Sequence, residues 1–216
     1  MRLYIVRHGE SRGNLAGTLQ GSRVDEPLSP RGVKQAEALS ARLAPEPIDA
    51  VWSSPMVRAR QTAEIVSAPH GVRVDLDADL REFDWGLWCG RPLDEEMERE
   101  VASIRALWRA GDLDAAPADG ESPSAAARRA ARFLDRLRPS PKGHVLIVAH
   151  GRFNRILMAT LLLRPLSRMD EIRQRNGSLS AFDWNGDGGA TPVLLDDVAH
   201  IPGDLRSLTG GSDSLK

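Results

Sequence analysis

The chain has 216 residues, with 29 basic and 30 acidic side chains, so its formal net charge is only −1. This balance excludes a protein that binds nucleic acid or an anionic membrane with its whole surface. The length fits one domain with a large core, and the single cysteine, Cys89, excludes an intramolecular disulfide. No apolar run approaches the roughly 20 residues that span a membrane. Since the first strand starts near Met1, we expect a cytoplasmic protein without a signal peptide.

The first predicted element is a buried strand at residues 3–6, apolar on both faces and followed by Arg7, His8 and Gly9. Glycine lets the backbone turn sharply, and ligands bind at the carboxyl ends of strands in open α/β sheets. His8 therefore stands where a reacting group is expected. A lone histidine after a strand is more commonly a loop residue, so this interpretation depends on the other strands.

Two further apolar runs end in the same way. Residues 50–53 lead to Arg58, and residues 144–149 lead to His150 and Gly151. Three predicted strands thus each end in a group that can bind or attack an anion. Chance explains one such ending better than it explains three.

Three Ser-Pro pairs indicate helix starts, with Ser as the N-cap and Pro at the first helical position. They are Ser29-Pro30, Ser54-Pro55 and Ser122-Pro123. Arg58 falls in the first turn of the second helix, where a cation opposes the helix dipole. An anion bound at the start of that helix would remove the conflict.

The remaining segments alternate between helices and strands. Residues 9–27 are typical of a loop with at most one helical turn, and residues 80–92 of a packed functional loop. Helices are expected at residues 93–110 and 156–163. Three further strands are expected, the last two antiparallel across a turn: residues 72–76, 179–184 and 193–198. This alternation predicts a three-layer α/β fold with a mostly parallel sheet.

We expect a single domain over residues 1–203 and a disordered tail over residues 204–216, where Gly, Ser and Asp dominate. The helix after Ser122 carries arginines mostly outside its apolar stripe, and a solvated face is their ordinary interpretation, with a basic patch as the alternative. These arginines are Arg128, Arg129, Arg132, Arg136 and Arg138.

Four motifs in chain order resemble the histidine phosphatase superfamily, whose members have the phosphoglycerate-mutase-like fold. They are Arg7-His8-Gly9-Glu10 with Asn14, Ser53-Ser54-Pro55 with Arg58, Leu80-Arg81-Glu82, and Ala149-His150-Gly151. The match runs from about residue 2 to about residue 184. The resemblance implies the same fold with a helical insertion over about residues 91–138. Relatives are often dimers, which leaves a homodimer open.

A phosphate monoester is a dianion near neutral pH and hydrolyses extremely slowly unaided. Its catalyst needs cations around the phosphoryl oxygens, an in-line nucleophile and an acid. Arg7 and Arg58 supply permanent charges, and His150 can contribute as an imidazolium facing the anion. Neutral His8 is the expected nucleophile, with a backbone carbonyl fixing its tautomer, and attack would give a phosphohistidine.

Glu82 is the expected general acid and base, because it is the Glu of the family's Leu-x-Glu pattern. It also lies in an apolar, Trp-containing stretch, where partial desolvation favours the protonated acid. Asp84 and Glu121 are its competitors, and Glu121-Ser122 matches a motif common in the phosphatase branch.

The same resemblance implies weaker assignments. Asn14 and Gly151 would contact the phosphoryl group, and Gln20 with Gly21 would line the substrate side. Cys89 stands where relatives often carry Glu, which affects substrate preference more than the reaction. An inert buried thiol is the favoured interpretation, ahead of a redox role.

The five histidines form no His-x-His or His-Glu-x-x-His pattern, and no cysteine cluster accompanies them. We therefore expect a metal-independent enzyme without a cofactor. The favoured function is a phosphomonoesterase acting on a small phosphorylated metabolite, with no nucleic-acid or membrane partner. Two alternatives are a phosphoglycerate-type mutase and a non-catalytic phosphate-binding interaction module. Specificity is expected to reside in the helical insertion and in the loop with Trp85 and Trp88.

Overall fold

The computed structural model describes residues 1–138 and 143–206. Six strands form one mixed sheet in the order β3-β2-β4-β1-β5-β6. The strands are β1 (Arg2–Arg7), β2 (Ala50–Ser53), β3 (Val74–Leu76), β4 (His144–Ala149), β5 (Leu179–Asp183) and β6 (Thr191–Asp197). The first four run parallel, while β5 and β6 pair antiparallel with their neighbours. The expected α/β fold, including its antiparallel last pair, is confirmed.

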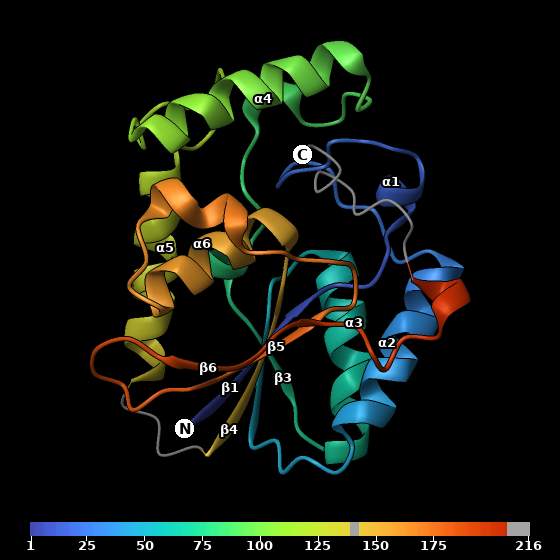
Figure 1. Ribbon diagram of the computed structural model, residues 1–216. Coiled ribbons are helices and arrows are strands. Elements are labelled where there is room, and N and C mark those ends of the chain that lie inside the picture. Colours follow the sequence, from blue (N-terminus) through green and yellow to red (C-terminus); the bar gives the residue numbers. More distant parts are fainter. Residues whose placement is uncertain (139–142, 207–216) are drawn as a thin grey trace.

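Helices cover both faces of the sheet (Figure 1). The α-helices of the described residues are α1 (Arg12–Leu15), α2 (Pro30–Leu43), α3 (Val57–Ser67), α4 (Glu95–Ala110), α5 (Pro123–Leu137) and α6 (Gly151–Leu161). In the view of Figure 1, α2 and α3 lie on one side of the sheet, and α5 and α6 lie on the other. Within the described residues, every helix is too short or too polar to cross a membrane.

Alternation along β1 divides the core into two layers. Leu3 and Ile5 are fully buried in the layer that contains α5 and α6. Tyr4 and Val6 point to the opposite face and pack with α2 and α3. Burial of each large apolar side chain contributes about 1.5–3 kcal/mol, so both faces hold β1 in place. The carboxyl end of this strand is therefore a rigid platform.

Two of the three predicted Ser-Pro helix starts are confirmed. The hydroxyls of Ser29 and Ser122 cap α2 and α5 by accepting backbone N–H groups. The prediction for Ser54 is wrong, because α3 begins at Val57 and its N-cap is Met56. The Ser54 hydroxyl accepts the N–H of Met56 at 3.3 Å, outside the helix, and lies 2.8 Å from His150 Nε2 after the neighbouring strand.

The predicted disordered tail begins too early. Residues Gly203–Leu205 form a 3-10 turn, and the Leu205 carbonyl accepts a hydrogen bond from Gln35 Nε2 on α2 at 2.7 Å. The rest of the predicted tail, residues 207–216, lies outside the described residues. So do residues 139–142, where the helix after Ser122 was expected to end.

Most of the arginines on α5 are exposed, as the predicted solvated face requires, whereas Arg129 is largely buried in an ion pair. Arg132 and Arg136 form ion pairs of 2.6 Å with Asp79 and Asp77, respectively. Acidic side chains from a segment some fifty residues earlier in the chain therefore face this helix, which sequence spacing did not reveal.

The two helices of the expected insertion occupy different places. On α5, the Phe133 ring packs edge-on against Trp52 of β2, with ring centroids 5.9 Å apart. This helix is therefore part of the layer that covers the sheet. By contrast, α4 lies beyond the end of the sheet at which the parallel strands finish (Figure 1).

The start of α2 packs backbone to backbone against the loop that follows β1. A Cβ atom on Gly32 would lie 2.0 Å from the Glu10 carbonyl oxygen, and one on Gly9 would lie 2.4 Å from the Gly32 carbonyl oxygen. The Ser29 N–H also donates to the Glu10 carbonyl at 2.8 Å. Only glycine allows this approach, which fixes the backbone next to His8.

The substitution Gly32→Ala should destabilise the protein by roughly 1–3 kcal/mol, because the added methyl group overlaps a backbone oxygen. Thermal unfolding checks this, with a melting temperature lowered by several degrees. Gly203→Ala is the matched control, since its Cβ would meet nothing within 4 Å. Equal melting temperatures for the two variants would contradict the packing described.

Candidate active site

The sheet register brings the three predicted strand ends together. Arg7 of β1 pairs with Ala149 of β4, so His8 and His150 follow side by side. Their ring centroids are 5.1 Å apart, with an interplanar angle of 61°. On the other side of β4 lies β2, and α3 after it carries Arg58 to the same edge.

The tautomer of His8 follows from its two neighbours. Its Nδ1 lies 2.6 Å from the Gly9 carbonyl oxygen, which can only accept, so Nδ1 carries the hydrogen. Arg58 Nε lies 3.2 Å from His8 Nε2 and can only donate, so Nε2 holds a lone pair. The carbonyl expected to orient His8 is thus Gly9's own. Burial lowers the pKa of His8 well below its ordinary value, and Arg58 and Arg7 lower it further.

Arg58 joins His8 to the opposite wall of the site. One terminal nitrogen donates to the Val24 carbonyl and the other to the Gly21 carbonyl, each at 3.0 Å. Burial lowers the pKa of Arg58 to about 10, although the Glu82 carboxylate raises it. Arg58 therefore remains a cation at neutral pH. The guanidinium therefore presents positive charge to whatever binds beside His8 Nε2.

Arg7 is a second buried cation at this point. It donates to the Gln174 carbonyl, and burial lowers its pKa. A Cβ atom on Gly151 would lie 3.1 Å from Arg7 Cζ. Glycine at the first position of α6 thus lets the guanidinium pack against the start of that helix.

His150 is fully buried, with one ring nitrogen in a hydrogen bond and the other buried without one. Nε2 lies 2.8 Å from the Ser54 hydroxyl, while Nδ1 has no hydrogen-bond partner among the described residues. Burial, then Arg58 and His8, lower the pKa of His150 well below its ordinary value. The imidazolium expected from the sequence therefore requires a bound anion to stabilise it.

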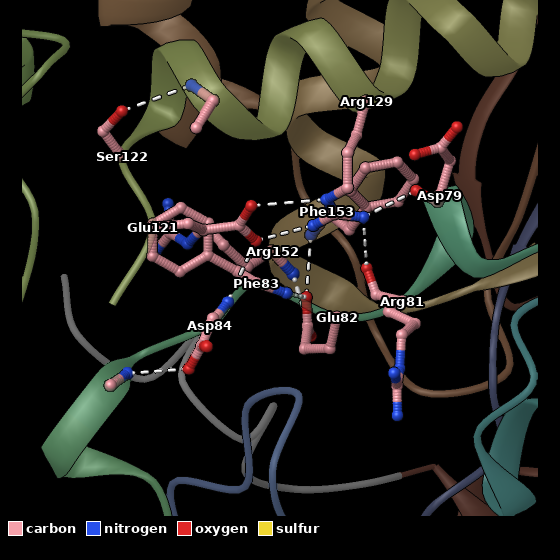
Figure 2. Close-up of polar contacts among 12 residues, drawn as sticks. Asp79, Arg81, Glu82, Phe83, Asp84, Glu121, Ser122, Arg129, Arg152 and Phe153 are labelled. Carbon is pink, nitrogen blue, oxygen red and sulfur yellow. Dashed lines mark hydrogen bonds and ion pairs between the residues drawn. The ribbon is translucent and has the colours of Figure 1, made fainter. Parts of the chain in front are cut away.

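The Glu82 carboxylate lies at the start of α6. It accepts the N–H of Phe153 at 2.9 Å, of Arg152 at 3.3 Å and of Phe83 at 2.8 Å. These backbone donors replace the apolar surroundings that the sequence predicted. Its competitors are bound elsewhere. Asp84 pairs with Arg23 at 2.9 Å. Glu121 pairs with Arg129 at 2.6 Å (Figure 2).

A cavity connects these groups. It is lined by Arg7, His8, Asn14, Thr18, Leu19, Gln20, Gly21, Arg58, Glu82, Trp85 and Leu93. Neither competing carboxylate lines it, whereas Glu82 does. Of the residues assigned to the site by sequence, His150 and Gly151 lie behind Arg7 and His8 rather than in this lining.

The weaker sequence assignments lie in the same wall. Asn14 Oδ1 accepts from the Ser11 N–H and from Asn176 Nδ2, which leaves the Asn14 amide nitrogen as a donor. Gln20 Nε2 donates to the Ser11 hydroxyl at 2.9 Å. Gly21 has φ of +54°, and a Cβ there would lie 2.6 Å from Cys89 Sγ. The pKa of the Cys89 thiol is raised, chiefly by burial, so the thiol stays protonated at neutral pH.

Sequence reasoning missed the polar residues that hold the His8 loop from behind. Thr62 Oγ1 accepts the Gly9 N–H at 3.2 Å, and Asn176 Nδ2 donates to the His8 carbonyl at 3.3 Å. Thr62 sits one helical turn after Arg58, which is the only local signal for it. Asn176 was interpreted only as half of an Asn-Gly turn.

The donor groups that a metal ion needs do not gather in the described part of the chain. Within residues 1–138 and 143–206, no three His, Cys, Asp or Glu side chains are grouped so as to hold an ion. Metal independence nevertheless stays a prediction.

A family model and individual relatives both match most of this chain. Residues 3–197 match the model of the histidine phosphatase superfamily (branch 1). The adenosylcobalamin/alpha-ribazole phosphatase of Salmonella typhimurium is 35% identical over 184 residues, covering 85% of this chain and 90% of the relative. The "Probable phosphoglycerate mutase GpmB" of Yersinia pestis is 34% identical over 185 residues, covering 85% of each chain.

A solved structure agrees with these relatives. The alpha-ribazole phosphatase from Shigella flexneri superimposes with a TM-score of 0.78 at 32% identity, covering 91% of this chain and 96% of that one.

In the ligand-free protein, His8 should carry its hydrogen on Nδ1 and stay neutral well below the pH at which an ordinary histidine titrates. Nitrogen-15 NMR of the imidazoles checks both points. Arg58→Gln removes one of the cations that lower the pKa of His8 and His150, so both pKa values should rise part of the way while burial persists. An Nε2–H tautomer of His8, or a charged ring at pH 7, would contradict the geometry.

Proposed function

The chain belongs to the histidine phosphatase superfamily and is a phosphatase, and we propose that it hydrolyses a small phosphomonoester through a phosphohistidine on His8. In this proposal Glu82 is the general acid and base, and no metal ion takes part. The observation that carries it is the tautomer of His8, whose lone pair at Nε2 faces Arg58 and the cavity. A neutral imidazole held in this form is a nucleophile ready to attack phosphorus.

Binding of the phosphoryl group would break the hydrogen bond between Arg58 and His8 and form several hydrogen bonds to the phosphoryl oxygens. Arg58 Nε would turn its hydrogen bond from His8 Nε2 to a phosphoryl oxygen, freeing the lone pair for in-line attack. Arg7 and the Asn14 amide are the further donors at this end of the cavity. The dianion would also favour a proton on His150 Nδ1, which converts that ring into a third cation.

The reaction then proceeds in two balanced steps. The lone pair of His8 Nε2 forms the N–P bond, the bond from phosphorus to the leaving oxygen breaks, and Glu82 gives that oxygen its proton. Water next attacks phosphorus while the Glu82 carboxylate takes its proton, the N–P bond breaks, and neutral His8 is restored. Positioned acid–base catalysis of this kind contributes about 10²–10⁴-fold.

The leaving group is expected to be uncharged. Beyond Arg7 and Arg58, no other cation lines the described cavity, and its outer wall consists largely of Thr18, Leu19, Gln20, Gly21, Trp85 and Leu93. An uncharged alcohol with hydrogen-bonding groups matches this polar lining, which already contains the Glu82 carboxylate, better than a carboxylate does. Relatives named alpha-ribazole phosphatases favour hydrolysis of a phosphomonoester, while the relative named a mutase motivates the alternative.

His8→Ala should lower turnover by roughly 10⁴-fold or more, because it removes the nucleophile. Rapid quenching in alkaline detergent with phosphorus-32 substrate should trap an acid-labile, alkali-stable adduct on His8 in the unsubstituted protein, and the labelling should proceed in excess chelator. His70→Gln is the control and should label normally. Brisk turnover without an adduct would contradict the mechanism, and dependence on a divalent ion would contradict metal independence. Phosphate binding without any turnover would favour the interaction module.

Incubation with 3-phosphoglycerate separates hydrolysis from mutase activity. We expect inorganic phosphate and no 2-phosphoglycerate. We also expect kcat/KM to be about tenfold lower than for an uncharged aromatic phosphomonoester, since the carboxylate would lose water without gaining a partner. Accumulation of 2-phosphoglycerate would favour the mutase.

A further inference from the structure

The backbone that carries Glu82 belongs to no helix or strand, yet it is held on both sides. Residues 81–85 link two short 3-10 turns, Ala78–Leu80 and Gly86–Trp88. A side chain on such a segment can place a proton accurately only if other groups fix the backbone. Polar contacts on both sides of Glu82 lead to one ion pair (Figure 2).

That ion pair joins Arg129 of α5 to Glu121 at 2.6 Å, and both members are largely buried. Arg129 donates one nitrogen to two carbonyl oxygens that precede Glu82: that of Asp79 at 2.6 Å and that of Arg81 at 2.9 Å. On the other side of Glu82, the Glu121 carboxylate accepts the Asp84 N–H at 3.0 Å, and the Glu121 N–H donates to the Asp84 carbonyl at 2.9 Å. The ion pair thus forms hydrogen bonds with the backbone both before and after Glu82.

Arg129 also contacts the element that receives the Glu82 carboxylate. Its guanidinium lies 4.4 Å from the centroid of the Phe153 ring in a cation–π contact. The N–H of Phe153 is one of the three that donate to Glu82. A single side chain therefore sets the position of the acid's backbone relative to the first turn of α6.

Arg136, two turns later on α5, binds side chains rather than the backbone around Glu82. Arg136 binds the carboxylates of Asp77 and Asp79, and it is about half exposed. It ties α5 to the segment before Glu82 but makes no described contact with the backbone on either side of the acid. This difference makes Arg136 a matched control for Arg129.

We propose that Arg129 and Glu121 act as a positioning pair for Glu82, so that proton transfer to the leaving oxygen depends on an ion pair that does not line the cavity. This inference rests on the proposed function of Glu82 as general acid. Lysine could not replace Arg129, because a point charge on a flexible stem cannot donate to two carbonyls and a carboxylate in one plane.

The test measures kcat/KM for a series of monoesters, from p-nitrophenyl phosphate through phenyl phosphate to an alkyl phosphate. This parameter reports the steps up to departure of the leaving group, where a poor leaving group needs the acid most. For Arg129→Gln and Arg129→Lys, we expect a loss of about ten- to a hundredfold with the alkyl phosphate and a much smaller loss with p-nitrophenyl phosphate. Inhibition by inorganic phosphate should not change. Arg136→Gln should behave like the unsubstituted protein across the series.

Two further variants separate this inference from the proposed function. Glu82→Gln should steepen the dependence on leaving group most, and Arg129→Gln added to it should cost little more if both act on one step. If Glu82→Gln leaves the dependence unchanged, the general-acid role itself fails. If Glu82→Gln steepens it while Arg129→Gln lowers all substrates equally, only the positioning role fails. Should Arg129→Gln fold poorly, Glu121→Gln keeps an oxygen for the Asp84 N–H and should give an intermediate steepening; an unchanged slope there would overturn the inference.

Discussion

The hydrogen bond from His8 Nδ1 to the Gly9 carbonyl is the contact on which the site depends. It leaves the lone pair on Nε2, the nitrogen that faces Arg58 and the cavity. The carbonyl is itself held in place, since the start of α2 packs against the same loop through Gly32. The geometry of two glycines thus determines which nitrogen of the imidazole can react.

The electrostatics of the site follow from crowding cations and imidazoles in a buried space. Two guanidiniums stay charged, and both histidines are held neutral by burial and by those charges. Within the cavity lining, Glu82 is the carboxylate that acts on both guanidiniums. In the proposed reaction, a phosphoryl dianion would add negative charge next to the two guanidiniums and would favour a proton on His150.

Much of the fold could be predicted from the sequence because its signals are local. Apolar runs locate β1, β2 and β4, and the residues after each run indicate the edge at which ligands bind. Parallel pairing then brings His8 and His150 together, which is a consequence of topology rather than of any one motif. The sequence after three separate strands therefore predicts one shared site.

What could not be predicted depends on contacts between distant residues. The Ser54 hydroxyl serves His150, 96 positions away, instead of capping its own helix. Arg129 looked like part of a solvated face, yet it contacts carbonyls about fifty positions earlier in the chain. Glu82 was expected among apolar groups, whereas the first turn of α6 supplies it with backbone donors. In each case a tertiary partner outweighed the local pattern.

The central claim is that phosphorus passes through a covalent bond to His8, and stereochemistry at phosphorus tests it most directly. A monoester made chiral with oxygen isotopes and sulfur would be hydrolysed in isotopic water, and the configuration of the thiophosphate product would be determined. Two successive in-line displacements, first by His8 Nε2 and then by water, predict net retention. Net inversion would mean that water attacks the substrate directly, and would contradict the account.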